Sequence, residues 1–383
     1  MKNNVIGYYS TKFGELWERS LDDLLREALH GVLAETQLEA AQIDAIFLGN
    51  MLGGIVERSL LLSAHISEIL GTNIPVYRVE SACASGGMAF QMANDYLKAN
   101  SGKTVIVIGA EKMTDVSPGE ITEALSAAAS PEEQDAGLTF PGVYALMAQY
   151  YLAKYGYTEE HLASIAVKNH DHGALNEKAH FQRAIDLNQV LGSQYVAFPL
   201  KVLDSSPISD GAAAVIMTNV DTLINNHKSV QVLAAETATD TISLSKRENL
   251  DELKATRIAG DKAFQTAGIA RSDVQVMEVH DCFSIAEIFA LEDLGFWTKG
   301  QGGKLAKEMS THINSGNNLI VNTSGGLKAA GHPVGGTGIK QIGEVYLQLT
   351  GQANKRQVNN VKHGLTHNVG GSGGVAVVSI LGV

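Results

Sequence analysis

Two cysteines occur in this chain of 383 residues, and the first lies where chemistry is possible. Cys83 stands within VESACASGGMAF (79–90), where an apolar, strand-like run gives way to small residues and then to a helix. A helix N-terminus offers unpaired N–H groups and positive partial charge, which favour a thiolate over a thiol. Small neighbours such as Ala82 and Gly86 would let a substrate carbonyl approach the backbone. The pattern fits a nucleophile, although a buried structural cysteine fits this stretch equally well.

A second loop contains a residue that could activate such a thiol. His332 lies within NTSGGLKAAGHPVGGTG (322–338), between a glycine and a proline. Core packing explains a histidine in that setting poorly. A neutral imidazole that is held rigidly beside a cysteine can act as its general base. We therefore expect His332 to lie close to Cys83.

Two further segments carry polar residues at the ends of apolar runs. In VMEVHDCFSIAEIF (276–289), His280 and Cys282 end a strand and open a helix, and Asp281 between them could simply cap that helix. THNVGGSGG (366–374) reads as a polar turn before the last strand. By itself this turn indicates only that the backbone comes close to another part of the molecule.

The elements that would position these loops form an internal repeat. Each copy contains a short apolar strand after a helical stretch, then a glycine-led helix with apolar residues at helical spacing, then a run rich in Val and Ile. Such runs, which show no alternation, suit a sheet that is covered on both faces. The paired segments are 40–50 with 269–281, 86–97 with 335–347, and 104–110 with 374–382.

The repeat predicts two α/β halves, residues 1–220 and 221–383. If matching loops pack together, Cys83 and His332 meet at a pseudo-twofold axis. The first half carries an insert at about 115–205 before the strand PISDGAAAVIMT (207–218). The insert is either a surface excursion or a lid over a site.

The insert also contains histidines, within VKNHDHGALNEKAHF (167–181). A solvated polar loop explains His170, His172 and His180, so no role is assigned to them.

Composition excludes several classes of protein. The net charge of −12, without a basic block, makes a nucleic-acid partner improbable. No CxxC or Cys/His ligand spacing predicts a zinc site. No apolar run approaches the roughly 20 residues of a membrane span, and neither a signal peptide nor a peroxisomal address is recognisable. A soluble cytoplasmic protein is expected.

Taken together, the motifs resemble those of the thiolase family over essentially the whole chain. The matching pieces are SACASGG around Cys83, SDGAAAV at 209–215, HDCF at 280–283, GHP at 331–333 and the final glycine-rich turn. The set is specific, whereas each motif alone is weak. The resemblance implies an α/β thiolase fold of two duplicated α-β-α-β-α halves in five layers, with a loop domain inserted in the first.

The resemblance also implies roles for individual residues. Cys83 matches the cysteine that takes the acyl group, and His332 matches the histidine that activates it. Many thiolases have NEAF where this chain has HDCF, which marks the sterol carrier protein-type thiolases and the similar archaeal acetoacetyl-CoA thiolases. His280 then takes the place of the Asn that holds a water in an oxyanion hole.

One departure from the common pattern concerns the last turn. Common thiolases have a CxG motif there, whose cysteine is the acid and base. This chain has Asn368, Val369 and Gly370 instead. In the HDCF branch the cysteine of that motif, Cys282, takes over, and it is the only other cysteine available.

The implied activity is that of a thiolase, an acyltransferase of lipid metabolism that makes or cleaves a carbon–carbon bond between acyl-CoA thioesters. In cleavage, Cys83 attacks the keto carbon, Cys282 protonates the leaving enolate, and free CoA then releases the acyl group. His332 and the water on His280 would stabilise the enolate. The backbone N–H groups of Cys83 and Gly370 would serve the second step. No metal or organic cofactor is expected, since acyl-CoA and CoA are the substrates.

Three alternatives stay open. A decarboxylating ketoacyl synthase would use a His/His or His/Asn pair, for which His367 and Asn368 could be mistaken. A second alternative is a subunit that is active only with an OB-fold, CoA-binding partner, alongside a hydroxymethylglutaryl-CoA synthase-like protein. The third is a non-enzymatic acyl-CoA or lipid-binding homologue. By resemblance, a homodimer or tetramer is expected.

Overall fold

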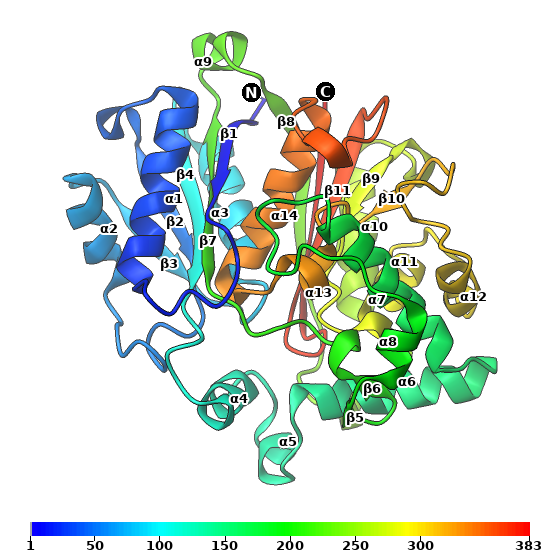
Figure 1. Cartoon of the computed structure of the whole chain (residues 1–383). Helices are drawn as coiled ribbons and strands as arrows, with labels where there is room; N and C mark the ends of the chain where they lie inside the picture. Colours follow the sequence, from blue (N-terminus) through cyan, green and yellow to red (C-terminus); the bar gives the residue numbers. More distant parts are fainter. Residues whose placement is uncertain (1) are drawn as a thin grey trace.

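The computed structural model describes residues 2–383 and shows helices packed on both faces of a large sheet (Figure 1). The sheet strands are β1 (Asn4–Ser10), β2 (Ala45–Gly49), β3 (Val76–Val79), β4 (Thr104–Glu111), β7 (Gly211–Thr218), β8 (Val230–Thr239), β9 (Val276–Glu278), β10 (Ile320–Val321), β11 (His363–Gly370) and β12 (Val375–Gly382). The helices outside the insert are α1 (Leu21–Thr36), α2 (Leu62–Leu70), α3 (Ser85–Ala99), α9 (Asp221–Asn226), α10 (Lys254–Ala267), α11 (Ser284–Asp293), α12 (Gly302–Lys307), α13 (Gly326–Ala330) and α14 (Val334–Leu349).

Strand order repeats itself across the sheet. In the described part of the chain, ten strands lie in the order β10-β9-β11-β12-β8-β1-β7-β4-β2-β3. The sheet consists of two sets of five strands, which read outward from the centre as β1-β7-β4-β2-β3 and β8-β12-β11-β9-β10. In both sets the successive neighbours pair antiparallel, antiparallel, parallel and parallel. The two sets meet where β1 pairs with β8 at Asn4 and Val5. The duplicated arrangement predicted from the repeat is therefore present.

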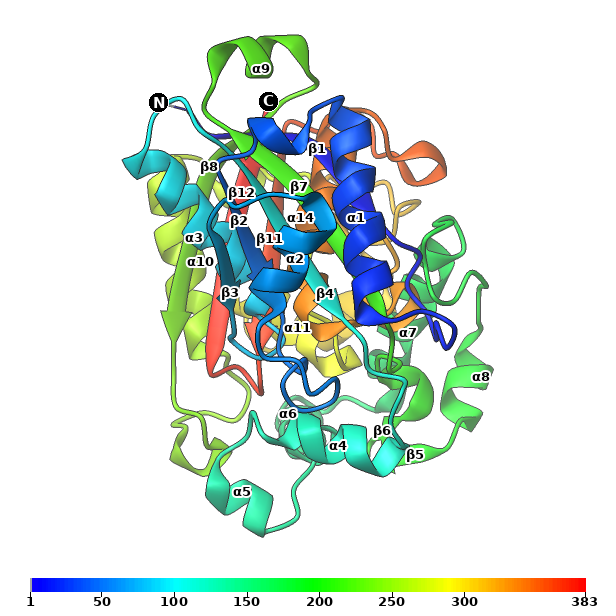
Figure 2. The ribbon, with the colours of Figure 1, turned by 90° about the vertical axis from the view of Figure 1, so that its left-hand side faces the viewer.

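Apolar clusters on both sides of the strands produce the layers. The first set of strands is covered by α1 and α2, which face the viewer in Figure 2. The second set is covered by α10 and α11. The glycine-led helices α3 and α14 lie between the two sets, where Phe90 and Ile339 share one buried cluster with strand residues from both halves. Burial on both faces explains the unbroken Val and Ile runs.

The two central helices cross at their N-terminal turns, where glycine is required. A Cβ atom on Gly86 would lie 2.7 Å from the carbonyl oxygen of Gly335, and one on Gly338 would clash with the backbone nitrogen of Gly87. Such contacts leave no room for a side chain. The crossing brings the loop before α3, from the first half, against the loop before α14, from the second.

One pairing predicted from the repeat is wrong. Residues 374–382 do not take the place of 104–110, because β12 matches β7 and β11 matches β4. The segment that reads as a polar turn is mostly strand, since β11 runs through His367 and Asn368 and the turn begins only at Gly371. These polar side chains are buried in the interior, so the strand lacks the apolar signature of its neighbours.

The insert forms a helical unit at one end of the sheet (Figure 1). It contains α4 (Pro118–Ser126), α5 (Pro131–Asp135), α6 (Phe140–Tyr155), α7 (Glu159–Gly173), α8 (Leu187–Gly192) and the hairpin of β5 (Tyr195–Ala197) and β6 (Leu200–Lys201). Among residues 2–383, no helix has both the length and the apolar character that crossing a membrane requires.

The polar run of the insert is not a solvated loop throughout. His170 and His172 lie in α7 and are buried, and His180 is partly buried. His172 is held by the carbonyl oxygen of Asn322 and the backbone N–H of Ile313. The solvated-loop explanation is therefore wrong for His170 and His172, which are both buried, and His172 joins the insert to the second half.

Candidate active site

Cys83 lies in a tight turn between β3 and α3, two residues before the helix begins. Ala82 has a φ of 50°, in the left-handed region that residues with a side chain rarely adopt. The turn is closed by the N–H of Ala84, which donates to the carbonyl of Ser81 at 3.0 Å. This geometry holds Cys83 at the N-terminus of α3, with its side chain partly exposed.

His332 precedes α14, in the loop that the glycine crossing places beside Cys83. Its backbone N–H donates to Ser209 Oγ at 3.3 Å, so the first residue of the SDGAAAV motif helps to hold the His332 loop in place. Its Nδ1 lies 2.7 Å from Thr337 Oγ1. That hydroxyl donates its own proton to the carbonyl of Pro333, so it accepts from Nδ1–H of His332. The Nε2 atom therefore has a free lone pair, as a general base requires.

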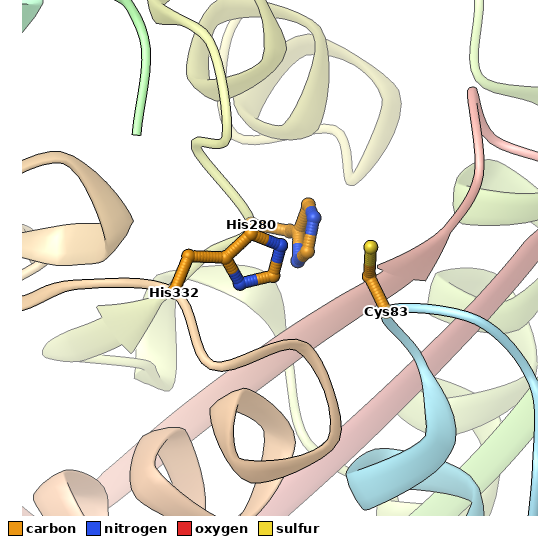
Figure 3. Close-up of side chains that lie close together, drawn as sticks. All are labelled: Cys83, His280 and His332. Atoms are coloured by element: carbon orange, nitrogen blue, oxygen red, sulfur yellow. The ribbon is translucent and has the colours of Figure 1, made fainter. Parts of the chain in front are cut away.

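His280 follows β9 and completes a group of three side chains. The sulfur of Cys83 and one ring nitrogen each of His280 and His332 lie within 4.8 Å of one another. The two rings are nearly perpendicular, with centroids 5.0 Å apart. Figure 3 shows the three side chains facing a common space from three separate elements. The structure thus brings together three of the residues predicted from the sequence.

Cys282 lies deeper, buried beneath the insert. The hydroxyl of Tyr144, from α6, donates to the carbonyl of Gly371 at 3.3 Å, and it also acts on the pKa of the Cys282 thiol. The buried ammonium of Lys328 donates to the carbonyl of Asp281 at 3.1 Å, directly before Cys282. Burial raises the pKa of Cys282 to about 12, and both Tyr144 and Lys328 oppose that rise.

The resting state of Cys83 differs from the expectation. Burial raises the pKa of the Cys83 thiol well above its usual range, and a charge on Cys282 acts in the same direction. Hydrogen bonds from backbone N–H groups, including that of Gly371, oppose the shift without cancelling it. Desolvation thus opposes the thiolate that the helix N-terminus favours, and its effect on the pKa of Cys83 is the larger of the two.

The neighbouring histidine has the opposite shift. Burial lowers the pKa of His332 to about 3, and the Lys340 ammonium contributes in the same direction. A neutral imidazole thus faces a protonated thiol. This pair can pass the thiol proton to His332 Nε2 while the sulfur attacks an electrophile.

β11 lies against the nucleophile turn. A Cβ on Gly370 would lie 2.6 Å from the carbonyl oxygen of Ser81, which explains the close backbone approach that the glycine-rich segment indicates. The amide of Asn368 contacts both the backbone of Cys83 and the ring of His280. His367 instead bonds Thr256 Oγ1 at 2.8 Å, toward α10. Because neighbouring residues of a strand point to opposite faces, His367 and Asn368 do not form a catalytic pair.

Asp281 does not cap α11, whose N-cap residue is Phe283. Its carboxylate accepts from the N–H of Leu327 at 2.6 Å and from the amide of Asn169 at 2.7 Å. Asp281 thereby ties the HDCF loop to the segment before His332.

Glu111 is a further tie, at the end of β4. Its carboxylate accepts from the N–H groups of Met51 and Leu52 and from that of Gly335, at the start of α14. Burial raises the pKa of Glu111 to about 7, although these N–H groups act against the shift. Glu111 holds the N-terminus of α14, and with it the His332 loop, against the first half.

Several residues of the site are absent from the sequence expectations. Thr337, Tyr144 and Glu111 gave no recognisable signal, because their roles depend on partners far away in the chain. Asn368 could have been suspected, since it occupies the position of the missing CxG cysteine.

Comparisons with known proteins agree with the motifs. Residues 4–221 match the family model described as "Thiolase, N-terminal domain", and residues 236–383 match "Thiolase C-terminal domain-like". An acetyl-CoA acetyltransferase of Methanothermobacter thermautotrophicus is 44% identical over 379 residues, 98% of each chain. Sterol carrier protein 2 of Bos taurus is 32% identical, over 97% of this chain and 71% of that protein.

A solved structure extends the agreement to the fold. The structure titled "Ltp2-ChsH2(DUF35) aldolase" superposes with a TM-score of 0.85 at 21% identity, over 100% of this chain and 98% of that one. The family models span nearly the whole sequence and include every loop of the site. The chain therefore belongs to the thiolase family of acyltransferases.

Proposed function

We propose that the chain is an acetyl-CoA C-acetyltransferase, which joins two acetyl-CoA molecules into acetoacetyl-CoA and CoA and also catalyses the reverse cleavage. The observation that carries the proposal is the convergence of the Cys83 sulfur with ring nitrogens of His280 and His332. The archaeal relative named acetyl-CoA acetyltransferase supports the choice of substrate. Acyl-CoA and CoA are the ligands of this reaction, which needs neither a metal nor an organic cofactor.

The first step transfers an acetyl group to Cys83. His332 Nε2 takes the thiol proton as the sulfur attacks the thioester carbonyl. The bond between that carbon and the CoA sulfur breaks, and Cys282 donates its proton to the departing thiolate. Cys282 suits this step because its raised pKa keeps it a thiol at rest.

The second step forms the carbon–carbon bond. The Cys282 thiolate removes a proton from the α carbon of a second acetyl-CoA, and the resulting carbanion attacks the acetyl carbon on Cys83. The bond to the Cys83 sulfur breaks, and this thiolate regains its proton from His332. Every group returns to its starting state, with acetoacetyl-CoA and CoA as products.

Oxyanions form at both carbonyl carbons and need hydrogen-bond donors. The backbone N–H groups of Cys83 and Gly370 are assigned to the acyl-enzyme, and His332 with the water on His280 to the enolate. Each donor in such a site contributes about 3 kcal/mol to the barrier reduction. Gly370 ends β11 beside the nucleophile turn, which is compatible with this assignment.

The direct test is turnover of the purified chain. We expect acetoacetyl-CoA from acetyl-CoA alone, and acetyl-CoA from acetoacetyl-CoA with CoA, both measured by chromatography of the CoA esters. An acetyl adduct without either product would support acylation but contradict the thiolase assignment.

His332→Ala should slow acylation about 10²- to 10⁴-fold, the range for loss of a general base. The pH profile separates this role from a structural one. A histidine with the usual pKa near 6.5 would be only about 3% neutral at pH 5. Because burial lowers the pKa of His332 to about 3, the wild-type rate should stay nearly flat between pH 8 and 5.

In His332→Ala the thiolate must form by loss of the proton to solvent, so the rate should rise about tenfold per pH unit. Acyl-enzyme formation is followed by quenched-flow mass spectrometry in both proteins. Parallel pH profiles would remove His332 from the role of base.

Tyr144→Phe should slow condensation about tenfold and leave acylation within about threefold. The reason is that the Tyr144 hydroxyl can turn from the carbonyl of Gly371 to donate to the Cys282 thiolate, which lowers the pKa of Cys282. Tyr155→Phe, a hydroxyl loss in the same helix but away from both cysteines, is the control. Equal effects of the two changes on condensation would argue against a contact that matters for catalysis.

A second candidate is the same chemistry in a subunit that needs an OB-fold, CoA-binding partner, alongside a hydroxymethylglutaryl-CoA synthase-like protein. The neighbour titled as a complex of Ltp2 with ChsH2(DUF35) favours it. So do the exposed apolar residues of the β5–β6 hairpin, with Tyr195 51% and Phe198 59% exposed. Full thiolase rates from the isolated chain would count against an obligatory partner.

The remaining expectations belong to the same proposal. Residues 1–220 and 221–383 are taken as the two halves, with the insert at about 115–205, and the cytoplasm as the location. A homodimer, alone or as half of a tetramer, would pair along the edge strand β3, where Tyr77 is 44% exposed. Sedimentation at the mass of a single chain would contradict this assembly.

A further inference from the structure

Asn368 reaches from β11, in the second half, into the first turn of α3. Its Oδ1 accepts from the backbone N–H of Gly87 at 3.0 Å, and its Nδ2 donates to the carbonyl of Cys83 at 3.0 Å. The amide therefore stands between two backbone groups that would otherwise bond each other at the start of a helix. Cβ atoms on Gly87 or Gly338 would collide with Oδ1, so the glycines of both central helices leave the space that the amide of Asn368 fills.

The backbone fixes which way the amide points. The N–H of Gly87 can only donate and the carbonyl of Cys83 can only accept. A flipped amide would place two donors together at Gly87 and two acceptors together at Cys83. The orientation of Asn368 thus follows from groups whose roles cannot change.

The second proton of that Nδ2 faces His280. Nδ2 lies 3.4 Å from His280 Nδ1, and because Nδ2 is a donor, Nδ1 must accept. A neutral imidazole that accepts at Nδ1 carries its proton on Nε2. The Nε2 atom of His280 is buried and has no hydrogen-bond partner among the described residues. A buried donor without a partner destabilises the fold, and such groups are retained where function requires them.

We propose that Asn368 is a positioning residue that holds His280 in its Nε2–H tautomer, so that His280 itself donates to the oxyanion of the reaction. The inference rests on the proposed function and deepens it. His332 has the opposite arrangement, with Nδ1–H bonded to Thr337 and Nε2 free to accept. The two adjacent histidines are thus one donor and one acceptor, each set by a single neighbouring side chain.

The surroundings of His280 agree with a neutral ring. Cys83 and His332 are the titratable groups that face it, and His367, on the other face of β11, also acts on its charge. Burial lowers the pKa of His280 well below its usual range, and the two histidines act in the same direction. A ring nitrogen that carries a proton cannot bind a metal ion, so His280 Nε2 would not act as a metal ligand beside Cys83 and His332.

This role explains why the CxG cysteine has no counterpart here. The position of that cysteine is taken by an amide that accepts from Gly87 and donates twice, which a thiol cannot do. The acid and base function is then left to Cys282, on the opposite loop.

The tautomer is measured directly by long-range ¹H–¹⁵N spectra of histidine-labelled protein, with His280→Gln to assign the signal. In the wild type we expect the neutral Nε2–H form of His280 and no titration between pH 8 and 5. Asn368→Asp keeps the shape but can only accept, so His280 should acquire a proton on Nδ1 and titrate within this range. Condensation should fall about 100-fold or more, the loss expected for one oxyanion donor.

Gln341→Glu is the matched control, because it makes the same change of amide to carboxylate at a buried residue that bonds the carbonyl of His367. It should leave the His280 signal unchanged. A wild-type His280 that is protonated on Nδ1, or an unchanged signal in Asn368→Asp, would overturn the inference. The spectra do not depend on turnover, so a failure of the proposed function would be recognised separately by the absence of acetoacetyl-CoA.

Discussion

Cys83→Ala should gain no acetyl group from acetyl-CoA, whereas the wild-type chain should gain one per polypeptide, and intact-mass spectrometry measures both. Alanine removes the sulfur that forms the thioester, and the nearby hydroxyl of Ser85 is bonded to the carbonyl of Ala82. Turnover should fall about 10⁵-fold or more, as when the nucleophile of a covalent mechanism is deleted. Because Cys83 is partly exposed in a turn, the fold should survive the change.

The control for this experiment is Cys282→Ala, which removes the other thiol and should still form the adduct. An adduct of normal size on Cys83→Ala would place the nucleophile elsewhere. It would then be necessary to explain why a strained turn, two histidines and the N-terminus of α3 converge on an inert sulfur.

Cys282→Ser should separate the two half-reactions. Acylation of Cys83 should survive within about tenfold, because CoA thiolate is a good leaving group and the His332 imidazolium can supply the proton. Condensation should fall about 10³-fold, because a serine hydroxyl is a far weaker base toward a carbon acid. Quenched-flow mass spectrometry gives the first rate, and acetoacetyl-CoA formation gives the second.

Phe283→Leu, a change in the next residue that leaves both thiols in place, shows how much of the effect comes from altered packing. Loss of both half-reactions to the same extent in Cys282→Ser would mean that Cys282 supports the structure of the site rather than proton transfer at carbon.

The architecture could be predicted from the sequence because the chain contains an internal repeat. In each half a short apolar strand, a glycine-led helix and a run rich in Val and Ile follow one another in the same order, and their apolar patterns indicate burial on both faces. The loops follow from the same logic: once the halves are related by a pseudo-twofold axis, Cys83 and His332 must approach each other.

The pKa shifts of the site residues could not be predicted from the sequence, because they depend on how deeply each group is buried. The helix N-terminus at Cys83 predicts a thiolate, yet desolvation reverses the sign of the pKa shift. β11 was misread for a related reason. Its polar residues suit a turn in isolation, and only the folded structure shows that Asn368 and His367 have partners inside the protein. Hydrogen bonds between residues hundreds of positions apart leave no local pattern.

The crossing of α3 and α14 at their glycines also determines when the molecule becomes active. Neither half alone contains a working site, since the first supplies the sulfur and the second supplies both imidazoles. Catalytic competence therefore requires both halves to be folded and packed against each other, because only then does the thiol lie beside its base.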